Sequence, residues 1–90
     1  MLEDKKKPLK TKNLKIIDHI GTLYATLDGN TIWEMDSSAY VVIKMCNGTK
    51  SLEQISKEIA KKTKLNQEDV KNTVRTILDE LERLNFIDYV

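Results

Sequence analysis

The chain contains few of the residues on which enzymes, metal sites and disulfide scaffolds depend. Its 90 residues include one cysteine, one histidine and one proline. A single cysteine, Cys46, excludes an internal disulfide and is typical of proteins in a reducing cytoplasm. His19 has no second histidine and no nearby cysteine in the sequence, so we expect no metal site.

Glycine-rich loops and long apolar stretches are missing as well. The three glycines cannot form a loop that cradles phosphates, and neither a Walker nor a Rossmann pattern occurs. The longest apolar run, "AYVVI", is far too short to span a bilayer, and no apolar segment typical of a signal peptide is visible. We therefore expect a cytoplasmic protein without membrane association, without a cofactor and without enzymatic activity.

What is present is the ordinary balance of a soluble domain, with 40% hydrophobic and 32% charged residues. The charge is unevenly distributed. Residues 1–12 hold five lysines against two acidic residues, whereas residues 13–90 hold 10 basic and 12 acidic residues. This pattern predicts a flexible basic arm at residues 1–12 and one small domain at residues 13–90.

Residues 14–35 carry β signals. The segments "LKII", "TLYATL" and "TIWEM" are rich in β-branched and aromatic residues and are separated by "DHIG" and "DGN". They predict a three-stranded antiparallel meander, with a tight primed turn at Asp28-Gly29 between the second and third strands. In the third strand, Ile32 and Glu34 point to one face and Trp33 and Met35 to the other.

From Asp36 onward the apolar period becomes helical. Asp36 or Ser37 caps a first helix, and Gly48 ends it by adopting a left-handed conformation. "SLEQ" at residues 51–54 is a capping box for a second helix, and Asn66 caps a third. The predicted buried positions are Ala39, Val42, Ile43 and Cys46 in the first helix, Leu52, Ile55 and Ile59 in the second, and Val70, Val74, Ile77, Leu78, Leu81 and Leu84 in the third.

The closing "FIDYV" is either a short strand or a docked tail. Strands followed by three helices, the last two joined by a short turn, predict an α+β fold that is winged helix-turn-helix-like. The core of this prediction is a three-stranded antiparallel sheet followed by three helices.

A helix-turn-helix order raises a winged-helix DNA-binding transcriptional regulator as one hypothesis. Residues 67–84 oppose it, because they hold three basic and five acidic side chains. A net-acidic helix is poorly suited to a phosphate backbone, so we regard nucleic acid as an unlikely partner. A small sheet also has an open edge, and such an edge can accept an extended peptide as an added strand.

The chain resembles the PqqD-like family, the RiPP recognition elements. The resemblance rests on "MDSSA" at residues 35–39, the apolar "YVVIKMC", Asn47-Gly48, "SLEQI" at residues 51–55 and the final "LNQEDVKNTVRTILDELERLNFID". It covers roughly residues 14–90. Where the family has Leu-Asn and Asp-Gly, this chain has Met-Asp and Asn-Gly, which preserve the apolar anchor, the helix cap and the left-handed stop.

The resemblance implies a non-catalytic adaptor that binds the leader segment of a ribosomally made precursor peptide and presents it to a modifying enzyme, often a radical SAM protein. In this family the leader adds to the third strand, here Thr31 to Met35, and lies against the third helix, here about Gln67 to Asn85. The residues that we expect to bind peptide are Ile32, Trp33 and Glu34 on the strand and Lys71, Val74, Arg75 and Leu78 on the helix. The two cations suit acidic leader side chains.

Several alternatives stay open at this point. Trp33 faces either the groove or the core beside Met35. Val74 and Leu78 fit core positions better than groove positions, and Lys71 and Arg75 are alternatively solvated side chains. A small subunit or dimerisation module without a peptide groove is a further hypothesis. The sequence is compatible with a monomer or a dimer, and with a standalone protein or a piece of a larger enzyme.

Overall fold

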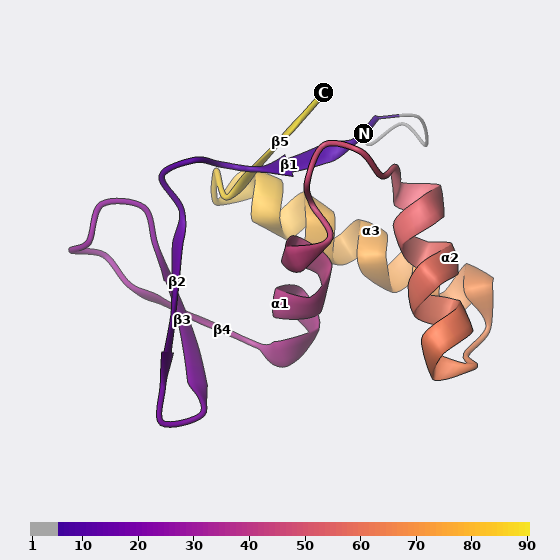
Figure 1. Cartoon of the computed structure of the whole chain (residues 1–90), viewed down its shortest axis with the longest axis horizontal. Coiled ribbons are helices and arrows are strands. Elements are labelled where there is room, and N and C mark those ends of the chain that lie inside the picture. Colours follow the sequence, from indigo (N-terminus) through magenta and orange to yellow (C-terminus); the bar gives the residue numbers. More distant parts are fainter. Residues whose placement is uncertain (1–5) are drawn as a thin grey trace.

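Three helices and five short strands make up the protein in the computed structural model, which describes residues 6–90 (Figure 1). In chain order they are β1 (Pro8–Lys10), β2 (Lys15–His19), β3 (Thr22–Thr26), β4 (Trp33–Met35), α1 (Ser37–Lys44), α2 (Leu52–Thr63), α3 (Gln67–Arg83) and β5 (Ile87–Tyr89). None of the helices in this part of the chain is long and apolar enough to cross a membrane.

The predicted α+β fold, with a three-stranded antiparallel meander followed by three helices, is confirmed. The strands lie in the order β2-β3-β4, with His19 opposite Thr22 and Leu23 opposite Met35. The predicted alternation along β4 also holds, because Ile32 and Glu34 are exposed while Met35 is buried. Figure 1 shows this sheet to one side of the helices, with β4 leading directly into α1.

The tight primed turn was predicted at the wrong place. It joins β2 to β3 at Ile20-Gly21, where both central residues have positive φ (52° and 82°), as a type I′ turn requires. Asp28 does not adopt positive φ, and six residues separate β3 from β4. The Asp28 carboxylate accepts the N–H groups of Asn30 and Thr31, both at 2.8 Å, and these bonds stabilise a wider loop instead.

The predicted helix caps are confirmed, because each depends on residues close in sequence. The Asp36 carboxylate accepts the Ala39 N–H at 2.8 Å at the start of α1. Ser51 and Gln54 form the capping box of α2, and Asn66 accepts the first N–H groups of α3. A helix begins immediately after β4 because Asp36 satisfies one of the unpaired N–H groups of the first turn.

The end of α1 differs from its prediction. The helix ends at Lys44 and is capped by Met45 in a right-handed conformation, ahead of Gly48. Gly48 does have positive φ (80°), but it lies beyond the helix. Backbone groups of residues 46–48 bind β1 instead, since Lys10 N–H donates to the Cys46 carbonyl (2.8 Å) and Gly48 N–H donates to the Pro8 carbonyl (2.9 Å).

The same contacts correct the predicted flexible arm. Pro8–Lys10 forms β1, which pairs with β5, and Pro8 is among the most deeply buried side chains. Proline fits at the first position of a strand, where a missing N–H costs little. The "FIDYV" segment is therefore a short strand over Ile87–Tyr89, whereas residues 1–5 of the predicted arm lie outside the described residues.

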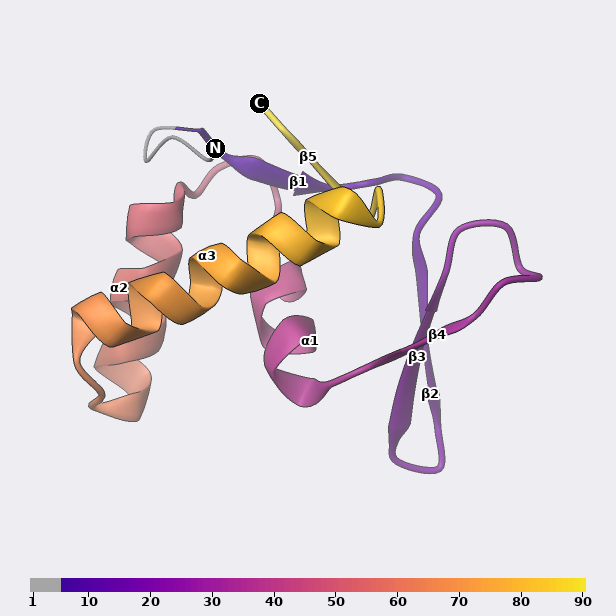
Figure 2. The same cartoon turned by 180° about the vertical axis from the view of Figure 1, so that it is seen from behind.

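The core lies between the inner face of the sheet and the three helices. Its buried apolar side chains come from every helix and from the sheet, and α2 packs along α3. The buried residues are Leu14, Ala25, Met35, Val42, Ile43, Cys46, Leu52, Ile55, Ala60, Val70, Val74, Leu78, Leu81, Phe86 and Ile87. Figures 1 and 2 both place the C-terminal half of α3 nearer to the sheet than its N-terminal half, which lies beside α2.

Candidate functional site

The strand β4 has an open edge. It pairs with β3 on one side, and within residues 6–90 no backbone hydrogen bond joins Trp33, Glu34 or Met35 to any other segment. Unpaired N–H and C=O groups along a strand edge are a template for another strand. Ile32, directly before the strand, is 55% exposed.

A groove of about 290 Å³ runs beside this edge, between β4 and the C-terminal half of α3. Figure 2 shows these two elements from the side on which α3 lies in front. The groove is lined by Trp33, Glu34, Met35, Asp36, Ala39, Glu80, Leu81, Arg83, Leu84 and Phe86. A strand added to β4 would therefore face apolar side chains on one of its two faces.

Trp33 is both a core residue and a groove residue. Its ring meets the Phe86 ring edge-on, with centroids 5.5 Å apart and planes at 81°. It is half-buried and packs against the core cluster, yet it also lines the groove. Trp33 thus packs against the core and lines the groove at the same time, so both of the alternatives that the sequence left open apply.

Charged groups lie along the rim of the groove. Arg83 Nε donates to Glu80 Oε2 at 3.0 Å, and this bond holds the pKa of Glu80 below its usual value and raises that of Arg83. Glu34 and Asp36 line the same groove and take part in no ion pair among residues 6–90. The rim therefore carries three carboxylates and one guanidinium, which favours a cationic ligand.

The structure places some of the expected peptide-binding residues at the groove and others in the core. Trp33 and Glu34 line the groove, and Ile32 lies at the end of the same strand edge. Val74 and Leu78 are only 2% and 0% exposed, so they belong to the core and present almost no surface.

The two expected cations lie elsewhere. Lys71 Nζ lies 2.8 Å from Glu53 Oε2 of α2. Arg75 is half-buried and precedes the groove-lining residues 80–84 of the chain by more than one helical turn. Neither residue lines the groove beside β4. The expected contact with acidic leader side chains therefore has no counterpart at this groove.

Sequence reasoning missed the helix residues that do line it, Glu80, Leu81, Arg83 and Leu84. A helix of 17 residues is roughly 25 Å long, whereas a strand of three residues spans about 10 Å. A short strand can face only part of such a helix, and the helical spacing does not say which part. The apolar pair Leu81 and Leu84, close to the end of the helix, was the available signal.

Two other hollows occur on the described surface. One, of about 360 Å³, lies among the three helices and is lined mainly by apolar side chains, including Val41, Leu65 and Ile77. The other, of about 620 Å³, lies between β1, the inner side of β2 and α1. The first has no strand beside it, and the second adjoins β2, the opposite edge of the sheet.

No group of three or more histidine, cysteine or acidic side chains suited to a metal ion occurs among residues 6–90. Cys46 is buried, and burial raises the pKa of its thiol to about 12. A thiol in this state is a poor nucleophile, because the thiolate is the reactive form.

The chain matches the model of a known protein family. The family model described as coenzyme PQQ synthesis protein D (PqqD) matches residues 21–87, about three quarters of the chain. The matched region runs from the turn between β2 and β3 to the first residue of β5, and it includes both sides of the groove. No curated protein and no solved structure matches the chain.

Proposed function

The chain belongs to the PqqD family, and from this premise we propose that it is a non-catalytic adaptor in the biosynthesis of a peptide-derived product. It binds the leader segment of a ribosomally synthesised precursor peptide and presents it to a modifying enzyme, which we propose to be a radical SAM protein. The observation that carries the proposal is the open edge of β4 beside an apolar groove on α3.

The leader adds to β4 as a further strand. Its backbone bonds to the free edge of Trp33, Glu34 and Met35, and alternate side chains point to the two faces of the extended sheet. Side chains on the inner face enter the groove and pack on Trp33, Leu81 and Leu84. This face selects apolar leader residues, because contact with the apolar side chains of the groove removes apolar surface from water on both partners.

Side chains on the other face lie next to Glu34. Opposite charges on adjacent strands attract, whereas like charges repel. Since Glu34 and Asp36 are acidic and the expected cations Lys71 and Arg75 lie away from the groove, we propose a leader in which basic residues alternate with apolar ones. This preference is opposite to the one expected from the sequence.

The test is a titration of the ¹⁵N-labelled full chain with synthetic leader peptides from precursors encoded beside the gene. We expect shift changes at Trp33–Met35 and at residues 80–84. Leu84→Glu places a charge on the apolar floor and should weaken binding by about tenfold or more. Leu65→Glu is the matched control, because Leu65 is 62% exposed and lines a different hollow. Equal loss in both variants, or shifts confined to the hollow among the helices, would contradict strand addition at β4.

A winged-helix regulator is the alternative, and the same samples test it. The helix α3 carries five acidic and three basic side chains, which disfavours a duplex. Binding of duplex DNA with a steep salt dependence, together with no response to any leader peptide, would replace the adaptor proposal by the regulator.

A further inference from the structure

The sheet has a second open edge, on β2. Within residues 6–90, the backbone of Lys15–His19 pairs only with β3. At five residues, β2 is longer than β4, and its edge spans about 17 Å. The family match begins at residue 21, so this strand lies outside the matched region.

A hollow of about 620 Å³ adjoins this edge in the same way that the groove on α3 adjoins β4. The sheet contributes Ile16, Asp18 and Leu23 from its inner face, and α1 contributes Tyr40, Ile43 and Lys44 on the opposite side. An added strand would place alternate side chains in this hollow. The volume lies within the range of known ligand pockets.

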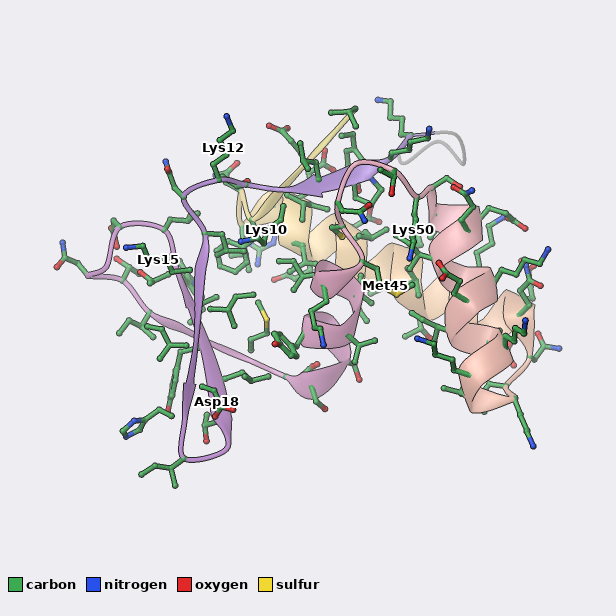
Figure 3. All side chains as sticks on the ribbon, in the orientation of Figure 1. Lys10, Lys12, Lys15, Asp18, Met45 and Lys50 are labelled. Carbon is green, nitrogen blue, oxygen red and sulfur yellow. The ribbon has the colours of Figure 1, made fainter. Side chains whose placement is uncertain are left out.

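The two edges have opposite charge. Among the residues that line the hollow, Lys10 and Lys44 are cations and Asp18 is the one carboxylate. Lys15 begins β2 and projects to the opposite face of the sheet from Ile16 and Asp18, so it would lie beside the outward side chains of an added strand. Figure 3 shows Lys10 and Lys15 on opposite sides of β2, with Lys12 at the bend before this strand. The β4 edge carries Glu34 and Asp36. Residues 6–15 contain five lysines and no acidic residue.

Two of these lysines, Lys10 and Lys44, are held in place by contacts of their side chains. Lys10 Nζ donates to the Leu14 carbonyl at 3.2 Å, and Lys44 Nζ lies 5.1 Å from the centre of the Tyr40 ring. Lys10 is on β1, whose backbone is fixed to the segment after α1. Lys10 and Lys44 are therefore positioned cations on the rim of the hollow, which increases their electrostatic value to a ligand.

We propose that the β2 edge and its hollow are a second docking site, which accepts an extended acidic segment of the modifying enzyme. The identification of that enzyme as the partner rests on the proposed function, whereas the charge and shape of the site do not. An adaptor that presents a peptide needs two separate surfaces, and the sheet offers one at each edge. Acidic side chains alternating with apolar ones match the rim and the hollow.

The test uses two synthetic octapeptides, one alternating glutamate and valine and the other alternating lysine and valine. Each is titrated into the ¹⁵N-labelled full chain. We expect the glutamate peptide to shift Ile16, Ile17, Asp18 and Lys44, and the lysine peptide to shift Trp33–Met35. Both peptides should bind to one molecule simultaneously.

Charge reversals separate a local site from a general attraction. Lys15→Glu and Lys44→Glu should each weaken binding of the glutamate peptide by about fivefold or more. Lys57→Glu is the matched control, because Lys57 is exposed on α2 and the charge change is the same, and it should have less than about a twofold effect. An equal effect of all three substitutions overturns the proposal.

Three further outcomes overturn it. They are no binding of the glutamate peptide, shifts away from β2, and displacement of the peptide by a twelve-residue oligouridylate of higher affinity, which would indicate a nucleic acid site. If leader peptides bind at β4 while the glutamate peptide causes no shift changes at the β2 edge, only this inference fails. If the β2 edge responds and no leader binds at β4, the proposed function fails instead.

Discussion

Cys46 couples the stability of this protein to alkaline pH. Burial raises the pKa of its thiol from 9.0 to about 12, and its Sγ lies 3.3 Å from the Val42 carbonyl, to which it donates. Because the folded protein holds this proton more tightly than the unfolded chain, the stabilisation is complete below pH 9 and is lost as the pH rises toward 12.

We therefore expect the thiol to lower the free energy of unfolding by about 2–3 kcal/mol between pH 8 and pH 11. Urea unfolding of the wild type and of Cys46→Ala at both pH values measures this loss of free energy of unfolding. The variant is less stable at pH 8 because it loses buried volume, but its pH dependence should be shallower. Identical pH dependence in the two proteins would contradict the buried, protonated thiol.

Ile20 has a strained backbone conformation, and its side chain is not buried to offset that strain. It has φ of 52° in the turn between β2 and β3, a conformation that β-branched residues rarely adopt, and its side chain is 89% exposed. Ile20→Asn should raise the free energy of unfolding by about 1 kcal/mol, since asparagine followed by glycine suits a type I′ turn. Ile20→Val keeps the β-branch and should leave stability unchanged in the same denaturation assay.

At the scale of elements, Asp36 sets the junction between β4 and α1. Its carboxylate accepts the Ala39 N–H at 2.8 Å, and the strand ends one residue earlier. Asp36→Ala should lower the free energy of unfolding by about 1 kcal/mol, whereas Asp36→Asn keeps the capping acceptor and should cost much less. Chemical denaturation of the wild type and both variants measures these changes. Equal destabilisation by the two substitutions would mean that the negative charge of Asp36, and not its capping hydrogen bond, stabilises the helix.

How much the sequence could predict depends on how local each interaction is. The caps at Asp36, Ser51 and Asn66 were predictable, because each acceptor bonds an N–H two or three residues ahead. The turn at Ile20-Gly21 was not, since isoleucine is a poor turn residue and only the pairing of His19 with Thr22 forces it into positive φ.

The site was predictable on its strand side and not on its helix side. The resemblance to the PqqD family pointed to the strand at Thr31 to Met35, and a strand this short leaves few residues to choose from, among them Trp33 and Glu34. Which part of α3 meets that strand depends on how the sheet and α3 pack together, and this arrangement is a tertiary property. Val74 and Leu78 matched the helical period but face the core.

At the scale of the whole molecule, β1 is part of the folded domain. Pro8 is buried, and Thr11 N–H donates to the Phe86 carbonyl at 2.9 Å. Removal of residues 1–11 should lower the free energy of unfolding by about 2 kcal/mol or more, since it exposes apolar surface on Ile87 and Cys46. Removal of residues 1–5 alone is the control. If both truncated proteins were as stable as the full chain, the prediction of a flexible arm at residues 1–12 would be supported instead.

The pairing of Pro8 with Tyr89 joins segments from nearly opposite ends of the chain. Closing so long a loop costs more chain entropy than forming a hairpin or a helix, so this ladder is a late event in folding. The helices and the β2–β3 hairpin need no help from it to form. During synthesis β1 must therefore wait for its partner strand until residues 87–89 have been made, whereas the groove beside β4 needs residues only as far as Phe86.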